Sequence, residues 1–210
     1  MITLYGPPAS SAGRCYWTLE EIGLGYETPE FSMKNKDHKA PEFLKLNPNG
    51  KVPALVDGDL VLWESIAINA YLAAKYAPAL LGTTPPDNAR VTQWSVWSQV
   101  EYQPPLIALF IQKMFVPAER RDGEVIKKSI EKGEALNAIV DAHLEGRNYM
   151  VGDAFTLADL NVASVARLNT IGGISLEARP NLKRWLDAML DRPARQKVNA
   201  LENASRAAAH

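Results

Sequence analysis

The stretch that decides the fold is residues 47–65, NPNGKVPALVDGDLVLWES. It runs from a turn-rich loop into two short apolar runs, residues 53–56 and 60–63, which an Asp-Gly-Asp turn separates. This pattern predicts a β-hairpin. The apolar spacing over residues 64–76 predicts a helix directly after it. The segment is therefore typical of an α/β domain.

Upstream of this segment, strand and helix patterns alternate. Residues 2–5 form a short strand-like run, and apolar residues spaced three and four apart over 11–23 predict a helix. Residues 26–31 have the composition of a second strand, whereas residues 32–50 are polar and rich in turn-forming residues. We therefore predict an α/β domain over residues 1–78.

Downstream, the strand signals end. Residues 79–88 predict a linker, and every long apolar pattern over residues 89–210 has helical spacing. Residues 155–160, FTLADL, predict a capping box, in which the Thr156 hydroxyl meets the Asp159 amide and the Asp159 carboxylate returns to the Thr156 amide. We assign this box to folding and give it no chemical role. The predicted fold class is an α/β domain followed by an all-helical domain.

Composition excludes several classes of function. The chain has 210 residues, is 47% hydrophobic and has a net charge of -1, so no overall charge attracts nucleic acid or an anionic membrane. Its single cysteine, Cys15, excludes an internal disulfide and a cysteine zinc cluster, and the three histidines are too far apart in sequence to indicate a metal site. With no apolar run near ~20 residues and no signal-peptide pattern, we expect a soluble cytoplasmic protein.

Val52 and Pro53 stand where the loop enters the first strand of the hairpin. A proline at this place suits a cis peptide bond, which would turn the Val52 backbone toward an extended ligand. An ordinary trans proline also fits the spacing. Because only about 5–6% of X-Pro bonds are cis in folded proteins, the spacing alone favours the trans form.

Three other motifs fit either a ligand site or a structural role. Glu64 and Ser65 open a helix, where free amides attract a carboxylate, but both residue types are also common in a first helical turn. Ser10 precedes the first helix, where a serine serves as an N-cap or as a hydroxyl donor to an anion. His38 and Lys39 lie in the polar loop, either as solvated charge or as contacts for a ligand carboxylate.

Together these motifs resemble the cytosolic glutathione transferase family, and the resemblance covers essentially the whole chain. The Ser10-x-x-x-Arg14 spacing is similar to the serine-type active-site motif of that family. Residues 47–68 resemble its glutathione-site segment, which runs from a cis-proline loop to a Glu-Ser helix. Residues 38–42, HKAPE, and 101–105, EYQPP, are most similar to the phi and theta-like classes.

The resemblance implies a thioredoxin-like domain that binds glutathione, followed by a helical domain that supplies most of the electrophile pocket. It implies the cis form of the Val52–Pro53 bond, with the Val52 backbone paired to the cysteinyl part of glutathione. His38, Lys39 and Lys51 would meet the glycine carboxylate, although relatives often carry Gln at the position of Lys51. The family also implies a homodimer and no metal.

The same resemblance implies how the remaining residues act. Glu64 and Ser65 would hold the γ-glutamyl end of glutathione. Ser10, at the family spacing from Arg14, would donate a hydrogen bond to the glutathione sulfur and favour the thiolate, which is the nucleophile. Ser11 is the alternative donor, because the two serines are adjacent and the sequence does not orient them.

We therefore expect a glutathione S-transferase, a detoxification enzyme acting on small hydrophobic electrophiles. The alternatives are a glutathione-binding carrier or regulatory protein with little turnover, and glutathione-dependent hydroperoxide reduction through the same thiolate. Cys15 is expected to be buried, which ranks thioltransferase activity lower. Tyr102 and Met114 are candidates for the electrophile pocket, and packing in the helical core is the alternative for each.

Overall fold

The computed structural model describes residues 1–207. It divides into two compact units. The first combines Met1–Leu81 with the chain from Asp191 onward, and the second is Gly82–Leu190. The final helix thus packs within the N-terminal unit, whereas the sequence grouped it with residues 89–210.

The first unit contains a four-stranded sheet in the order β2-β1-β3-β4. Its strands are β1 (Ile2–Tyr5), β2 (Tyr26–Glu27), β3 (Ala54–Asp57) and β4 (Leu60–Trp63). β1 pairs parallel to β2 and antiparallel to β3, and β3 pairs antiparallel to β4. The predicted hairpin is confirmed, whereas the strand predicted over 26–31 is only two residues long.

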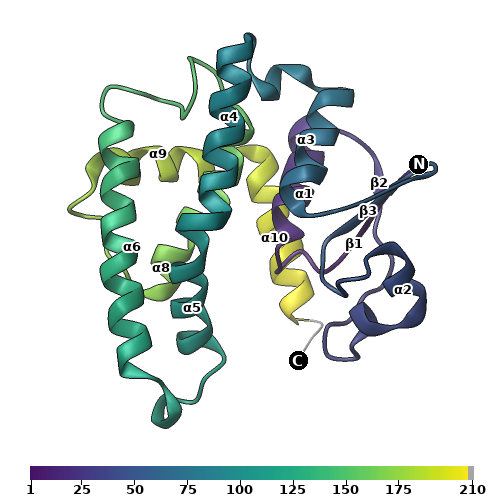
Figure 1. Ribbon diagram of the computed structural model, residues 1–210, viewed down its shortest axis with the longest axis horizontal. Coiled ribbons are helices and arrows are strands. Elements are labelled where there is room, and N and C mark those ends of the chain that lie inside the picture. The colour runs from purple at the N-terminus through teal and green to yellow at the C-terminus, as the bar shows by residue number, and fades with distance from the viewer. Residues whose placement is uncertain (208–210) are drawn as a thin grey trace. The chain divides into compact units, whose positions relative to one another are not determined.

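Four α-helices belong to this unit, and they are α1 (Gly13–Ile22), α2 (Pro41–Leu46), α3 (Ser65–Tyr76) and α10 (Pro193–Ala207). α1 packs against both α3 and α10 (Figure 1). α2 lies within the segment that the sequence analysis described as turn-rich. It begins with Pro41 in its first turn, which is a favourable place for proline, and it buries Phe43.

The second unit is all-helical in the part of the chain that the structure describes. Its α-helices are α4 (Pro85–Trp97), α5 (Gln103–Met114), α6 (Gly123–His143), α7 (Leu157–Ala166), α8 (Leu168–Gly172) and α9 (Pro180–Leu190). The predicted fold class, an α/β unit and an all-helical unit, is confirmed. α4 begins at Pro85, so the last four residues of the predicted 79–88 linker are helical.

The predicted capping box is present at the start of α7. The Asp159 carboxylate accepts bonds from the Thr156 amide and hydroxyl, at 3.0 and 3.1 Å. It also accepts from the Met150 amide at 2.7 Å and from Trp185 Nε1 at 3.0 Å. Asp159 is fully buried, so one carboxylate ties the loop before α7 to α9.

Candidate functional site

The first turn of α1 and the loop before β3 meet at Gly6. Its φ is +121°, and a Cβ atom there would lie 2.7 Å from Cβ of Val52 and 3.3 Å from Cβ of Ala12. Only glycine allows this approach, because a side chain would overlap Val52 and the positive φ is strained for other residues. Two segments that the sequence placed in one site therefore both lie against Gly6.

The peptide bond between Val52 and Pro53 is cis. This is the form that the family resemblance implied, and it differs from the trans form that spacing alone favoured. Pro53 is buried and Val52 is half-buried. Among the described residues, no hydrogen bond uses the backbone N–H or C=O of Val52. These two groups are available to an extended ligand backbone.

Glu64 and Ser65 stand at the junction of β4 and α3. Glu64 has a φ of +70°, is exposed, and provides no side-chain cap for α3. The amides of the first turn of α3 have no partner within the helix, and they carry the positive end of its dipole. Ser65 is buried, and its hydroxyl accepts a bond from Nη1 of Arg14 at 3.3 Å. The start of α3 is therefore linked to α1 and can receive a carboxylate.

The two serines before α1 have different environments. The Ser10 hydroxyl donates to the Pro7 carbonyl at 2.6 Å and accepts from the Ala12 amide at 3.1 Å. Ser11 is exposed, and its hydroxyl forms no hydrogen bond within the described chain. The Ser10 oxygen is thus fixed in position at the start of α1, whereas its proton points to a carbonyl that a stronger acceptor can replace.

His38 and Lys39 lie in a 3₁₀ turn, Asp37–Lys39, that contacts the loop before β3. Nζ of Lys39 donates to the carbonyl of Gly50 at 2.9 Å. Nδ1 of His38 is buried and has no hydrogen-bond partner. Lys51 is exposed. The structure therefore brings the predicted His38-Lys39 pair next to the loop that carries Val52.

Asn47 is a residue of this region that sequence reasoning did not single out. It is buried, its Nδ2 donates to the Lys51 carbonyl at 2.6 Å, and its Oδ1 accepts from the Asn49 amide at 3.0 Å. These bonds fix the turn just before Val52. The Asn-Pro-Asn-Gly sequence was the available signal, because asparagine commonly stabilises such turns through its side chain.

The two residues predicted for the electrophile pocket lie in the second unit. Tyr102 is fully buried, and its hydroxyl donates to Oδ1 of Asn137 and accepts from Nδ2 of Asn169 at 3.0 Å. Burial raises its pKa above the usual range. These contacts make Tyr102 part of the helical core and argue against a place in a pocket wall. Met114, at the end of α5, is 59% exposed.

Cys15 lies in the core of the first unit. Cys15 is fully buried with its Sγ 3.7 Å from the Ser65 carbonyl, as expected for a packing role. Burial raises the pKa of its thiol to about 12, so it is protonated at neutral pH. Within residues 1–207, no cluster of three or more histidine, cysteine or acidic residues is arranged to hold a metal. No helix in that range has the length and apolar character to cross a membrane.

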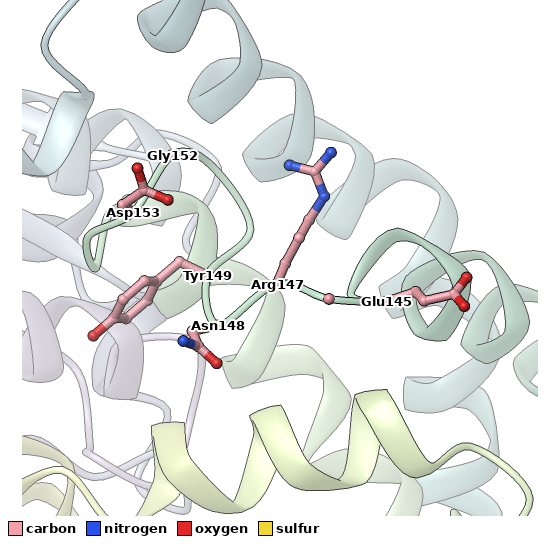
Figure 2. A pocket seen from close by; sticks show the side chains of 7 residues that line it. Glu145, Arg147, Asn148, Tyr149, Gly152 and Asp153 are labelled. Carbon is pink, nitrogen blue, oxygen red and sulfur yellow. The ribbon is translucent and has the colours of Figure 1, made fainter.

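A hollow of about 390 Å³ lies in the second unit, over the loop between α6 and α7. It is lined by polar side chains that include Glu145, Arg147, Asn148 and Asp153. Figure 2 shows these side chains pointing away from one another. Such an arrangement offers no converging set of groups to a ligand, so the candidate site stays in the first unit.

Comparisons with known proteins match both parts of the chain. The family model for the glutathione S-transferase N-terminal domain matches residues 1–74, and the model for the C-terminal domain matches residues 103–193. Glutathione S-transferase 3 of Zea mays is 39% identical over 211 residues, which cover 95% of this chain and 93% of that protein.

Solved structures give the same result. A glutathione transferase from Populus trichocarpa superposes with a TM-score of 0.89 at 31% identity, covering 97% of this chain and 100% of the other. A theta class glutathione S-transferase from Xanthomonas axonopodis pv. citri, solved with glutathione bound, has a TM-score of 0.87 at 34% identity, covering 93% and 95%. The resemblance seen in the motifs is confirmed.

Proposed function

Because this chain belongs to the glutathione S-transferase family, we propose that it adds glutathione to small hydrophobic electrophiles, with a serine hydroxyl beside the sulfur. The relatives named glutathione S-transferase match this chain over nearly their whole length. This supports transferase activity with glutathione as the co-substrate. The serine, the residues that hold each part of glutathione, and the type of electrophile are the new elements of this proposal.

One observation carries it: four segments distant in sequence converge in the first unit, namely the start of α1, the Asp37–Lys39 turn, the loop before β3 and the start of α3. Gly6 lies between Val52 and Ala12, the residue just before α1, and Arg14 links α1 to Ser65. Lys39 joins the loop before β3. A tripeptide needs a backbone partner, a carboxylate site at each end and a group near its thiol, and these segments offer all of them close together.

Each part of glutathione has a suitable partner in this proposal. The unpaired backbone groups of Val52, next to Pro53, would pair with the cysteinyl residue. The free amides at the start of α3, which begins at Ser65 after Glu64, would receive the γ-glutamyl carboxylate.

The glycine end of glutathione would lie at the Asp37–Lys39 turn and the loop before β3. His38, Lys39 and Lys51 would meet the glycine carboxylate. The buried, unpartnered Nδ1 of His38 supports this, since a buried polar atom without a partner costs free energy that a ligand can recover.

Ser10 is the proposed donor to the thiolate. The Ala12 amide holds its oxygen in place. When a thiolate is present, the hydroxyl proton would rotate from the Pro7 carbonyl to the more negative sulfur. A donor to the charged form, together with the helix end, lowers the pKa of the thiol and raises the population of the nucleophile. Ser10 forms no covalent bond in this mechanism.

The test is the pKa of the bound glutathione thiol, which is measured from the ultraviolet absorbance of the thiolate as a function of pH. We expect a lowered pKa in the wild type, a rise toward about 8.5 in Ser10→Ala, and no change in the matched variant Ser11→Ala. The reverse outcome for the two variants would assign the role to Ser11. Binding with an unshifted pKa would instead indicate a carrier, and a hydroperoxide assay separates peroxidase chemistry from transfer.

Dimerisation and the electrophile complete the proposal. β4 is an edge strand with the apolar residues Leu60, Val61 and Trp63 each 37–41% exposed, which supports an interface between two copies of the chain. Sedimentation of Trp63→Lys against the wild type tests it, with a shift to monomer expected.

Met114, exposed and apolar, is the remaining candidate for contact with the electrophile, and Met114→Ala should raise the KM for that substrate alone.

A further inference from the structure

The first unit has a cavity between β1, the segment after β2, and α2. We call it the α2 pocket. Its volume is about 440 Å³, within the range of small-molecule sites. None of the residues proposed to hold glutathione lines it. The lining that matters for its chemistry consists of three aromatic and three acidic residues, Tyr5, Phe31, Phe43, Glu30, Asp37 and Glu42.

The rings of Tyr5 and Phe31 both lie beside Phe43 at steep angles. The Phe31 and Phe43 centroids are 5.0 Å apart with their planes at 63°, and those of Tyr5 and Phe43 are 6.1 Å apart at 58°. Phe43 is buried, whereas Tyr5 and Phe31 are half-buried. All three aromatic residues line the cavity, and aromatic faces attract cations.

The acidic residues add negative charge that the protein does not neutralise. Glu30 and Glu42 are exposed, and neither forms an ion pair within residues 1–207. Asp37 accepts a hydrogen bond from the Ser32 amide at 2.6 Å and likewise has no cationic partner there. No lysine, arginine or histidine lines the pocket. An anion such as glutathione is therefore disfavoured, and a cation with apolar surface is favoured.

We propose that the α2 pocket binds organic cations that carry an aromatic or quaternary ammonium group. Such a ligand places its cationic head against the rings, as aromatic cages do, while the three carboxylates balance its charge. Its apolar body fills the cavity between the rings. This site is separate from the proposed glutathione site, and its occupancy does not depend on the transferase mechanism.

The test uses benzyltrimethylammonium as the cation, with benzyl alcohol and benzoate as neutral and anionic probes of similar body. Two-dimensional amide NMR spectra of the full chain follow binding, and the same spectra show whether each variant keeps its fold. We expect the cation to shift resonances of residues 29–46 and Tyr5, with weaker binding at higher ionic strength. The two other probes should bind at least severalfold more weakly.

Variants separate charge from ring contacts. The double variant Glu30→Gln with Glu42→Gln and the single variant Phe31→Leu should each weaken cation binding by about two- to tenfold. Glu177→Gln, an exposed acidic residue of the second unit, is the matched control and should leave binding unchanged. Equal binding of benzyl alcohol, no shift at the α2 pocket, or unchanged affinity in both pocket variants would overturn the proposal.

Discussion

Replacing Asp159 with asparagine should destabilise the protein far more than the loss of one charge suggests. Oδ1 of Asp159 accepts from the Met150 amide and Trp185 Nε1, and Oδ2 accepts from the Thr156 amide and hydroxyl. An asparagine side chain keeps one oxygen and places an NH₂ group at the other position. With the NH₂ group at the Oδ1 position, the Met150 amide and Trp185 Nε1 both face a donor instead of an acceptor. With the NH₂ group at the Oδ2 position, the Thr156 amide faces a donor, whereas the Thr156 hydroxyl can rotate and accept.

The magnitude follows from the number of bonds lost. A hydrogen bond to a charged group contributes about 1.5–3 kcal/mol, so the loss of one or two lowers the free energy of unfolding by about 1.5–6 kcal/mol. For a chain of 150–250 residues, each kcal/mol corresponds to about 2–4 °C, which gives a drop in Tm of roughly 3–24 °C. Asp159→Ala removes all four acceptor contacts and should lower Tm further.

Thermal unfolding followed by far-ultraviolet circular dichroism, at one protein concentration, measures the effect. Asp153→Asn is the control, because Asp153 is an exposed aspartate in the loop just before α7. Its substitution should change stability by no more than about 0.5 kcal/mol. A Tm for Asp159→Asn equal to that of the control would refute the argument that the four bonds hold the loop and helices together.

Three further predictions concern the first unit. Bonds from Lys75 and two tyrosines lower the pKa of Asp57 from 3.8 to about 2, so wild type should exceed Asp57→Asn in urea midpoint above pH 4, and this advantage should vanish as the pH falls through 2. Gly50→Ala should raise the KM for glutathione severalfold, because its Cβ would lie 2.8 Å from the backbone carbonyl oxygen of His38 and would displace the turn that carries His38 and Lys39. Gly58→Ala, with a similar φ of +62° but open space around it, is the control, and an equal rise in KM there would contradict this reasoning. Cys15 should resist thiol reagents at pH 7 until the protein is unfolded in denaturant, and rapid modification of the native protein would contradict its burial.

Local patterns were sufficient for much of the first unit. The hairpin follows from two apolar runs around a Gly-containing turn, and the first helix follows from its apolar spacing. The capping box could be predicted because Thr156 and Asp159 are three residues apart, so the bonds that define it are local. The burial of Cys15 follows from its position on the apolar face of α1.

Features that depend on contacts between distant residues could not be predicted from the sequence. α2 is six residues long, and the partners of its one buried residue, Phe43, are Tyr5 and Phe31, which come from outside the helix. For Tyr102, the sequence left a pocket wall and the helical core open as alternatives. The core was decided by Asn137 and Asn169, which bind its hydroxyl from 35 and 67 residues away.

The sequence by itself determined the hairpin, the longer helices with clear apolar spacing, the change from mixed to all-helical pattern and the short motifs that carry the family resemblance. All of these depend on neighbours within about one helical turn or one hairpin. Only the tertiary structure decided which motifs meet. α10 packs in the first unit, where Arg192 forms an ion pair with Glu21 across 171 residues. The same holds for the contacts of Gly6 with Val52 and of Arg14 with Ser65, since atoms so far apart in the chain become neighbours only when the core closes.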